Sequence, residues 1–333
     1  MPALAVADTL RADGVEVEFA GGERAEAQLV PAAGYPFHRV PAVGLDRRNP
    51  LKALRALLKA LRGLGTALAL VRRSRPDVVM GGGGYVAGPV GLAAVLLRVP
   101  LVLTEADSHL GIANRVLAPF ARRVCLAFPV DGRTGSKYRV TGRPVPPPVT
   151  DRAAARAEFG IGPEETCVLV FGGSLGARTI NQAAIEAFRG ATFRVLHVCG
   201  ERDEPALRPR VPGPYYVLRA YVQPFGNALA AADLAVARAG GSVFELASHG
   251  LPAILVPYPH ATADHQTGNA RWMADAGAAV IVADADLTAA RLASEVGTLL
   301  GDRARLAAMA RASANLARPD AAREIADEIR AAA

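Results

Sequence analysis

Two glycine-rich segments each stand between an apolar run and a helical pattern, an arrangement that can bind phosphate. The first is Phe171-Gly172-Gly173-Ser174-Leu175-Gly176-Ala177-Arg178. Its glycines let a phosphate approach the backbone, the helix start supplies N–H groups, and Ser174 can donate its hydroxyl or cap the helix. The spacing matches neither a dinucleotide fingerprint nor a P-loop. A tight turn without a ligand is the alternative.

The second segment is Arg238-Ala239-Gly240-Gly241-Ser242-Val243-Phe244-Glu245. It places Glu245 in a first helical turn, where a carboxylate can accept two hydrogen bonds from a vicinal diol such as that of ribose. An acid at this position also stabilises a helix through its dipole, without any ligand. Together the two turns favour a nucleotide site in this half of the chain.

A polar loop follows a further apolar run, from Val256 to Asn269. His260, His265, Gln266 and Asn269 concentrate neutral donors and acceptors there, as sugar hydroxyls require. A solvated loop is the alternative.

Metal-binding patterns are weak. The two histidines of this loop lack a convincing third ligand, and Asp284-Ala285-Asp286, an acid-x-acid pattern, is interpreted as a solvated turn. Each cysteine lies in an apolar run without metal spacing, which predicts buried free thiols at Cys125, Cys167 and Cys199. We therefore expect no metal and no cofactor.

Four consecutive glycines, Gly81 to Gly84, precede Tyr85. Each glycine costs conformational entropy on folding, so the run favours a turn that a bulky substrate approaches closely. The residues expected to face that substrate are Gly82, Gly83, Gly84 and Tyr85. Flexibility without a ligand is the alternative.

The segment from Leu51 to Leu70 predicts a basic amphipathic helix. Four basic residues share one face: Lys52, Arg55, Lys59 and Arg62. Leucines share the opposite face, among them Leu54, Leu58 and Leu61. Such a helix can lie in an anionic membrane interface. A surface helix with its leucines in the core is the alternative, and Gly63 and Gly65 weaken the helix.

Apolar runs alternate with helical patterns, which predicts an α/β fold with parallel sheets covered on both faces. The Pro-rich stretch Thr141 to Pro148 interrupts this rhythm as a stiff linker. We expect two doubly wound domains facing a cleft, residues 1–143 and 144–318, and a helix at 319–333 that packs back on the first. The first domain opens with a helix, Pro2 to Arg11, before its first strand, Val15 to Phe19, so this crossover helix has no strand in front of it.

The composition is that of a globular protein. The 333 residues are 51% hydrophobic and 21% charged, which excludes a disordered chain and a disulfide scaffold. The net charge is +7, but only 5% of residues are aromatic, which disfavours nucleic-acid readers that stack bases. Because no apolar run could span a membrane and the first residues lack a basic segment, we expect a cytoplasmic protein.

Five stretches resemble the MurG family, the peptidoglycan N-acetylglucosaminyltransferases that convert lipid I into lipid II. They are PALAVADTLR, GGGGYVAGPVGLAA, TEADSHLGIANRVLAPFARRVCLAFP, VFGGSLGARTINQA and RAGGSVFELASHGLPAILVPYPHATADHQTGNA. The resemblance implies a GT-B fold, with lipid I received by the first domain at the cytoplasmic face of the cell membrane. UDP-N-acetylglucosamine would bind the second domain, and the transfer would be inverting and metal-free.

The same resemblance implies donor contacts: Ser174 to the diphosphate, the Val222 backbone to uracil, Ser242 and Val243 to the nucleotide, Glu245 to ribose, and His265, Gln266 and Asn269 to the sugar. The chain departs from the family pattern at Glu105-Ala106-Asp107, usually Glu-Gln-Asn, and at Arg143-Pro144-Val145-Pro146, usually Asn-Pro-x-Arg. Asp107 and Arg143 are then the donor-binding candidates of those segments.

The family pattern opens with a strand, a glycine loop and a His near the acceptor hydroxyl, and this chain begins at the end of that motif. The resemblance therefore leaves the catalytic residue unassigned. We expect the 333-residue form to bind the donor and to transfer weakly. Three alternatives are another GT-B lipid glycosyltransferase, a UDP-sugar epimerase, and a non-catalytic nucleotide-sugar-binding protein.

Overall fold

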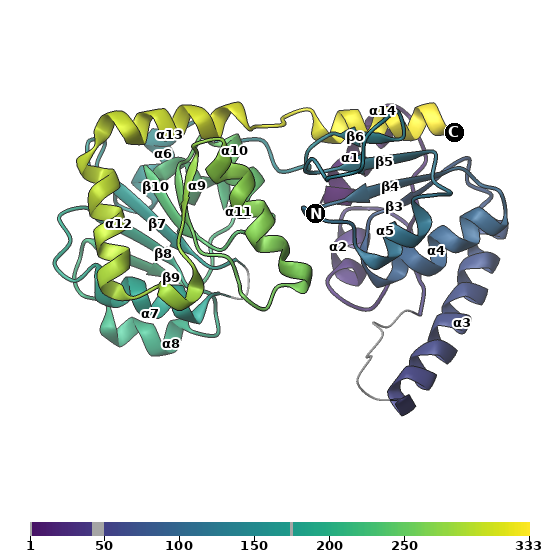
Figure 1. Cartoon of the computed structure of the whole chain (residues 1–333), viewed down its shortest axis with the longest axis horizontal. Helices are drawn as coiled ribbons and strands as arrows, with labels where there is room; N and C mark the ends of the chain where they lie inside the picture. Colours follow the sequence, from purple (N-terminus) through teal and green to yellow (C-terminus); the bar gives the residue numbers. More distant parts are fainter. Residues whose placement is uncertain (1, 42–49, 174–175) are drawn as a thin grey trace. The chain divides into compact units, whose positions relative to one another are not determined.

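The computed structural model describes residues 2–41, 50–173 and 176–333, with residues 50–60 described by their backbone alone. The chain divides into two units, Met1–Pro144 with Asp320–Ala333, and Val145–Pro319 (Figure 1). All strand pairs formed by the described residues are parallel. The predicted α/β class with parallel sheets is therefore confirmed.

The first unit contains two separate sets of strands. β1 (Phe19–Gly21) pairs with β2 (Phe37–Arg39), and a second sheet has the order β3-β4-β5-β6. The strands of this second sheet are β3 (Val79–Gly81), β4 (Leu101–Glu105), β5 (Arg123–Leu126) and β6 (Tyr138–Val140). The helices are α1 (Pro2–Ala12), α2 (Glu26–Ala32), α3 (Pro50–Ser74), α4 (Gly84–Leu96), α5 (Ile112–Leu117) and α14 (Ala321–Ala332).

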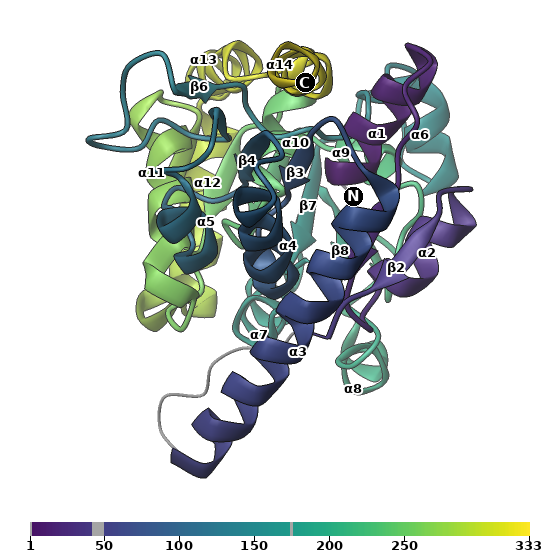
Figure 2. The same cartoon turned by 90° about the vertical axis from the view of Figure 1, so that its right-hand side faces the viewer.

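Helices cover both faces of these strands (Figure 2). Val6 and Leu10 of α1 pack with Ile325 and Ile329 of α14 in one apolar cluster. The carboxylate of Asp13 pairs with Arg323 and Arg330 of α14, at 2.5 and 2.6 Å. The last helix is thus part of the first unit, although the whole second unit separates it from α1 in sequence.

The expected strand at Val15 to Phe19 is wrong except for its last residue, because β1 runs from Phe19 to Gly21. Its ladder begins where the Phe19 N–H donates to the Pro36 carbonyl, at 2.9 Å. Proline has no N–H to continue the ladder backwards, so residues 15–18 precede the pairing. Alternation of side chains alone did not reveal this boundary.

The second unit is a doubly wound sheet with the order β12-β11-β10-β7-β8-β9. Its strands are β7 (Cys167–Phe171), β8 (Arg194–Val198), β9 (Tyr216–Arg219), β10 (Leu234–Ala237), β11 (Ala253–Leu255) and β12 (Ala279–Ile281). Its helices are α6 (Arg152–Glu158), α7 (Arg178–Ala187), α8 (Glu204–Leu207), η1 (Arg208–Arg210), α9 (Gly226–Ala231), α10 (Val243–Ser248), η2 (Thr262–Asp264), α11 (His265–Asp275), η3 (Asp284–Asp286), α12 (Ala289–Gly301) and α13 (Arg303–Asn315).

The strand order of this sheet reverses between β7 and β10, which are neighbours paired from Leu234 with Val168 to Ala237 with Phe171. Successive strands are added on one side up to β9 and then on the other from β10. Open α/β sheets bind ligands outside the carboxyl ends of the strands at such a switch point. The fold therefore predicts a ligand site at the turns that follow β7 and β10.

Candidate functional site

The first glycine-rich turn connects β7 to α7. A Cβ at Gly172 would lie 2.3 Å from the Ala177 nitrogen, and one at Gly176 would lie 2.2 Å from the Cys199 carbonyl oxygen. These two glycines are therefore required by packing. Gly173 has a φ of +83° and open space where a Cβ would be, so a ligand can approach its backbone. Ser174, the predicted diphosphate contact, lies outside the described residues.

The second glycine turn connects β10 to α10. The N–H groups of Val243 and Phe244 donate to the carbonyls of Gly240 and Gly241, at 3.2 and 3.3 Å. The Val243 side chain is fully buried, so Val243 can meet a ligand through its backbone alone. Glu245 lies half-buried in the first turn of α10, as the sequence predicted. The second glycine turn therefore follows β10, the strand that neighbours β7.

The polar loop after β11 is tied to the second turn. Asn269 of α11 is fully buried and its side-chain amide donates to the Ala239 carbonyl at 3.0 Å. The Gln266 side-chain oxygen accepts from the Tyr258 N–H at 2.9 Å, and the His265 Nδ1 contacts the Thr262 carbonyl at 2.9 Å. These contacts hold the loop and the turn together; contact of the three side chains with a sugar stays a prediction.

Sequence reasoning missed an arginine at the centre of this edge. Arg238 is 8% exposed and donates to the carbonyls of Val256 and Pro257, at 3.1 and 3.2 Å. It also forms an ion pair with Asp284 at 2.5 Å, and the other Asp284 oxygen accepts from Thr179 at 3.4 Å. The interpretation of Asp284 as part of a solvated turn is therefore wrong. Its partner lies 46 residues earlier in the sequence, which no local pattern reveals.

The loop after β9 reaches the same strand ends. Val222 is buried, and Phe225 stacks edge-on against Phe171, the last residue of β7, with ring centroids 4.9 Å apart. The loop that carries the predicted uracil contact is therefore anchored beside the first glycine turn.

The loop before α11 contains strained backbone. Ala263 and Asp264 have left-handed φ values of 52° and 53°, which side chains other than glycine adopt at a cost of roughly 1–2 kcal/mol each. Such strain gathers at functional sites. The residue types of this loop do not predict the strained backbone.

The remaining predicted residues lie in the first unit. Gly82, Gly83 and Gly84 follow β3 with open space where each Cβ would be, and Tyr85 is 59% exposed. Arg143 follows β6. The expected acceptor turn is thus an accessible glycine turn at a strand's carboxyl end.

The Asp107 candidate lies in a loop that the buried Glu105 organises. The Glu105 carboxylate accepts from the N–H groups of Ala106, Asp107 and Gly111, at 3.0, 3.3 and 2.8 Å. It also accepts from the Asn114 side chain at 2.9 Å. Glu105 therefore shapes the backbone at the carboxyl end of β4.

The predicted basic helix is α3, which continues across Gly63 and Gly65 to Ser74. Packing requires a glycine at position 63, because a Cβ there would lie 2.2 Å from the Pro41 carbonyl oxygen; that the two glycines weaken the helix stays a prediction. Leu64 and Leu68 pack in the core, whereas Leu61 is 57% exposed. Five predicted side chains lie outside the described residues: Lys52, Leu54, Arg55, Leu58 and Lys59.

The predicted thiols are buried and unpaired. Burial raises the pKa of Cys125 and of Cys167 to about 12, so both are inert at neutral pH. Within the described ranges, no three His, Cys, Asp or Glu side chains gather as a metal site would require. In the same ranges, no helix combines the length and apolarity that crossing a membrane demands.

Models of two known protein domains match this chain. Residues 1–126 match the glycosyltransferase family 28 N-terminal domain, and residues 167–325 match the glycosyltransferase family 28 C-terminal domain. Two α/β units, one with glycine turns at the switch point of its sheet, and matches to both domain models define a glycosyltransferase of the GT-B fold.

Individual relatives narrow this class. A Moorella thermoacetica UDP-N-acetylglucosamine–N-acetylmuramyl-(pentapeptide) pyrophosphoryl-undecaprenol N-acetylglucosamine transferase is 44% identical over 96% of this chain and 92% of its own. The crystal structure of Acinetobacter baumannii MurG matches with a TM-score of 0.82 at 30% identity, over 99% of this chain and 95% of that one. The chain belongs to the MurG family.

A structure described as a putative UDP-N-acetylglucosamine 2-epimerase from Listeria monocytogenes also matches, with a TM-score of 0.63. It covers 94% of this chain and 95% of its own but is only 15% identical. That likeness shows the fold alone.

Proposed function

We propose that this glycosyltransferase moves N-acetylglucosamine from UDP-N-acetylglucosamine to lipid I, forming lipid II for peptidoglycan. The observation that carries the donor half is the switch point of the second unit, where Gly173, the second glycine turn and Glu245 follow neighbouring strands. The printed names of the curated relatives support the sugar and the lipid-linked acceptor.

In this reaction the muramoyl 4-hydroxyl oxygen bonds to the anomeric carbon while the bond from that carbon to the diphosphate oxygen breaks. The bonding pair leaves with UDP, and the hydroxyl proton passes to a base that the described residues do not identify. Attack opposite the leaving group inverts the anomeric centre. Backbone N–H groups and helix dipoles at the starts of α7 and α10 stabilise the departing diphosphate, so the step is metal-free.

Each donor contact is proposed at a definite place. Ser174 meets the diphosphate, the Val222 backbone meets uracil, and Glu245 meets the ribose. Ser242 and Val243 bring backbone to the nucleotide, while His265 and Gln266 face the sugar. Asn269 supports this surface through Ala239, and Asp107 and Arg143 are further proposed donor contacts. The glycine turn with Tyr85 receives lipid I.

The test is transfer of radiolabelled N-acetylglucosamine to lipid I, with and without chelator. We expect a product that carries the label on the muramoyl 4-hydroxyl in the β configuration, at a rate that chelation leaves unchanged. Loss of donor binding on chelation contradicts the metal-free step. Conversion of UDP-N-acetylglucosamine to its 2-epimer without transfer contradicts the proposed function altogether.

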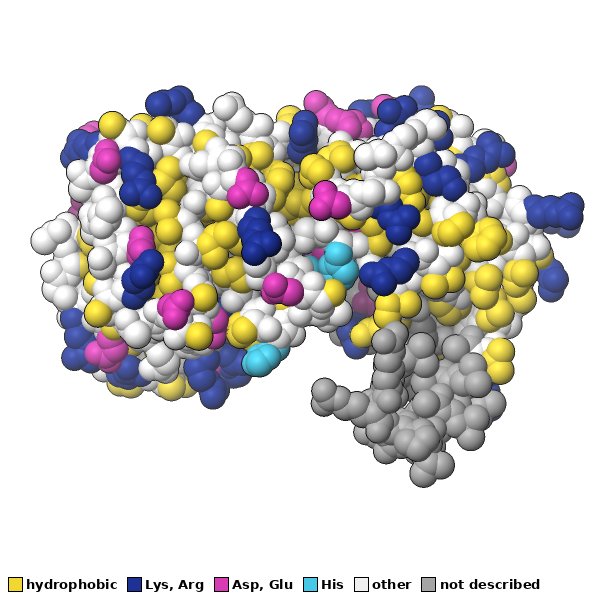
Figure 3. All heavy atoms as spheres, viewed as in Figure 1, with side chains coloured by type: hydrophobic (Ala, Val, Ile, Leu, Met, Phe, Trp, Pro, Cys, Tyr) yellow, Lys and Arg dark blue, Asp and Glu magenta, His cyan; other side chains and the backbone are white. Residues whose placement is uncertain are grey.

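We also propose that the first unit contacts the cytoplasmic surface of an anionic membrane peripherally. Large apolar side chains are exposed on α3, on α4 and on the segment of α5: Leu61, Leu92, Leu96, Ile112, Val116 and Phe120, each at least 39% exposed. Arg62, Arg98 and Arg115 are exposed on the same segments. Figure 3 shows apolar and basic side chains close together over α4 and α5. Apolar insertion and attraction to anionic lipid act together at such surfaces.

Vesicle co-sedimentation tests this second proposal. Val116→Asp with Phe120→Asp should release the protein from anionic vesicles, and high salt should weaken binding because it screens the arginines. Val140→Asp, which adds a charge at an exposed valine of β6, is the matched control and should bind normally. Equal binding by all three chains contradicts the proposed surface.

A further inference from the structure

Asp284 connects the elements that carry the two glycine turns of the second unit. It lies in η3, shortly after β12, and its side chain is 18% exposed. One carboxylate oxygen pairs with Arg238, the residue that follows β10, at 2.5 Å. The other oxygen accepts from the hydroxyl of Thr179, in the first turn of α7, at 3.4 Å. A single carboxylate therefore links the helix after the first turn to the residue that begins the second.

Arg238 extends this link to the polar loop after β11. Its Nη1 donates to the carbonyls of Val256 and Pro257, at 3.1 and 3.2 Å, and is the same atom that pairs with Asp284. Three oxygens thus compete for the two hydrogens of one nitrogen. The guanidinium carbon also lies 5.4 Å from the centre of the Tyr258 ring. Arg238 therefore fixes the start of the loop, and Asp284 fixes Arg238.

The backbone of this loop depends on such an anchor. Pro257 and Pro259 have no N–H, so at these two positions only the carbonyls can take part in a backbone hydrogen bond. Further along, Ala263 and Asp264 hold left-handed backbone, which persists only where surrounding contacts determine it. A loop of this kind changes shape when a contact at its start is lost.

Charge makes Asp284 and Arg238 dependent on each other. Arg238 is 8% exposed, and within the part of the chain that the structure describes Asp284 is the only acid paired with it. A buried guanidinium bound to carbonyls alone lacks a counter-ion, which is strongly unfavourable. Without Asp284 we expect the guanidinium to leave the two carbonyls and to reach for solvent or for another anion.

We propose that Asp284 is a positioning residue for the donor sugar. Through Arg238 it holds the start of the loop that carries His265 and Gln266, and it acts without touching the donor itself. The inference rests on the proposed function, because this loop is the proposed sugar surface. Since UDP is bound at the two glycine turns in that proposal, loss of Asp284 weakens the sugar contacts selectively.

Calorimetry with UDP and with UDP-N-acetylglucosamine tests this role in the 333-residue chain. The readout is the ratio of the two affinities, because a general loss of folded protein affects both ligands equally. In Asp284→Ala we expect the affinity for UDP-N-acetylglucosamine to fall about tenfold relative to that for UDP, as loss of one or two hydrogen bonds to the sugar would cause. Asp284→Asn keeps the volume and an oxygen for Arg238, so its ratio should fall about threefold. The asparagine variant also decides the question if the alanine variant does not fold.

Two comparisons separate positioning from a merely structural role. Asp286→Asn removes the exposed second acid of η3 and should leave the ratio unchanged. Arg238→Gln should lower the ratio, and adding Asp284→Ala to it should have no further effect, because residues that act through one another are not additive.

Three results would overturn the role of Asp284. One is an unchanged ratio in both Asp284 variants while His265→Ala lowers it. Another is an additive loss when Arg238→Gln and Asp284→Ala are combined. The third is an equal loss in Asp286→Asn. A ratio that His265→Ala also leaves unchanged contradicts instead the proposed sugar surface, and with it the inference.

Discussion

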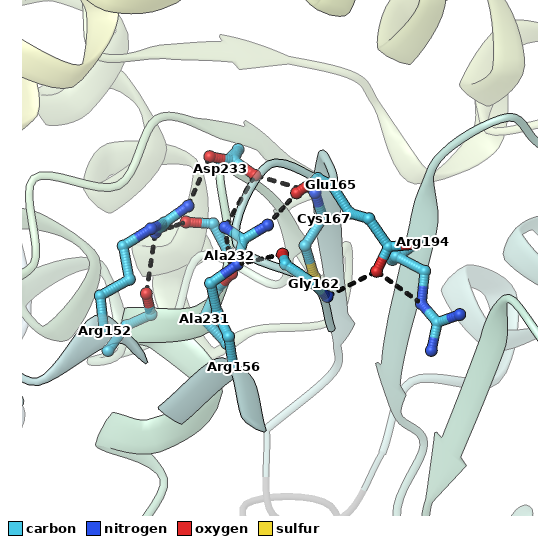
Figure 4. Close-up of polar contacts among 10 residues, drawn as sticks. Arg152, Arg156, Gly162, Glu165, Cys167, Arg194, Ala231, Ala232 and Asp233 are labelled. Atoms are coloured by element: carbon cyan, nitrogen blue, oxygen red, sulfur yellow. Dashed lines mark hydrogen bonds and ion pairs between the residues drawn. The ribbon is translucent and has the colours of Figure 1, made fainter. Parts of the chain in front are cut away.

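The two edges of the second unit's sheet use the same residue types for opposite purposes. At the amino edge, Asp233 accepts from the Cys167 N–H at 2.8 Å and pairs with Arg152 at 2.6 Å and Arg156 at 3.6 Å (Figure 4). Arg156, whose side chain is 5% exposed, also donates to the carbonyls of Gly162, Glu165 and Ala231. This edge satisfies its charges internally.

At the carboxyl edge, Gly173 and Gly240 have open space where a Cβ would be, and Glu245 is half-buried in the first turn of α10. Arg238 is likewise committed to carbonyls, but those carbonyls belong to the loop that a ligand would meet. The difference teaches that a buried charge by itself does not mark a site. What distinguishes the carboxyl edge is open backbone beside the charged groups.

Asp233→Ala should affect the amino edge most strongly. It leaves the buried Arg156 guanidinium without its counter-ion, and we expect unfolding free energy to fall by about 3 kcal/mol, the low end for a broken buried pair because Asp233 is partly exposed. Urea unfolding measures this, and UDP affinity of the folded fraction should not change. Glu186→Ala, which removes the exposed ion pairs with Arg189 and Arg210, is the control and should cost much less. A tenfold loss of UDP affinity in Asp233→Ala would break the comparison.

His197 connects the interior to the carboxyl edge. Asn181 of α7 donates to the Cys199 carbonyl, so its oxygen accepts from His197 Nε2 at 3.0 Å, while the Tyr216 hydroxyl donates to His197 Nδ1 at 2.7 Å. This arrangement satisfies the neutral ring, and burial lowers the pKa of His197 to about 3.

Because the unfolded histidine has a pKa near 6.5, unfolding takes up a proton below that value, and this part of the stability is present above pH 6.5 and lost as pH falls towards 3. Between pH 7 and pH 5 we expect a loss of about 2 kcal/mol that His197→Gln abolishes. Denaturant unfolding at both pH values measures it. His260→Gln, at an exposed histidine, should keep the full pH dependence; an identical loss in His197→Gln would show that another group titrates.

Glu245→Ala should affect the carboxyl edge. Loss of the ribose hydrogen bonds should reduce UDP affinity about tenfold, or about 1.4 kcal/mol, by calorimetry. Asp151→Ala is the matched control, since Asp151 caps α6 by accepting from the Ala154 N–H at 2.9 Å. It should lower Tm and leave UDP affinity intact. Unchanged affinity in Glu245→Ala would remove the ribose role.

The smallest expected effect is that of Ala263→Gly. Glycine relieves the left-handed backbone at Ala263, and we expect a gain of about 0.5–1 kcal/mol in unfolding free energy. Ala261→Gly changes a residue in extended conformation and should instead destabilise. If both substitutions destabilise equally, the strain at Ala263 contributes nothing.

Local patterns predicted much of this molecule. Two local segments carry the pattern, each about a dozen residues long. One is the buried run Cys167–Phe171 with the glycines after it. The other is Leu234–Ala237 with its glycines and Glu245 in the next helical turn. The α/β class and the two glycine turns at helix starts could therefore be predicted.

What escaped prediction depends on partners far apart in sequence. Arg238 forms an ion pair with Asp284, and Asn181 forms a hydrogen bond with His197. The short strands β2 and β6 contain polar residues and so have the composition of loops. The charge of Asp284 and the side-chain amide of Asn181 can be assigned a role only once the folded sheet has brought their partners close. Burial of these groups is a tertiary property, which residue order alone did not reveal.

The packing of α14 on α1 also governs the order of events during synthesis. Unit 2 is encoded between the two parts of the first unit, so its residues are complete before Ile325 and Ile329 leave the ribosome. At about 5–20 residues per second, the intervening chain takes roughly 10–35 s to make. For at least that time, Val6 and Leu10 lack the apolar cover that Ile325 and Ile329 provide in the folded protein.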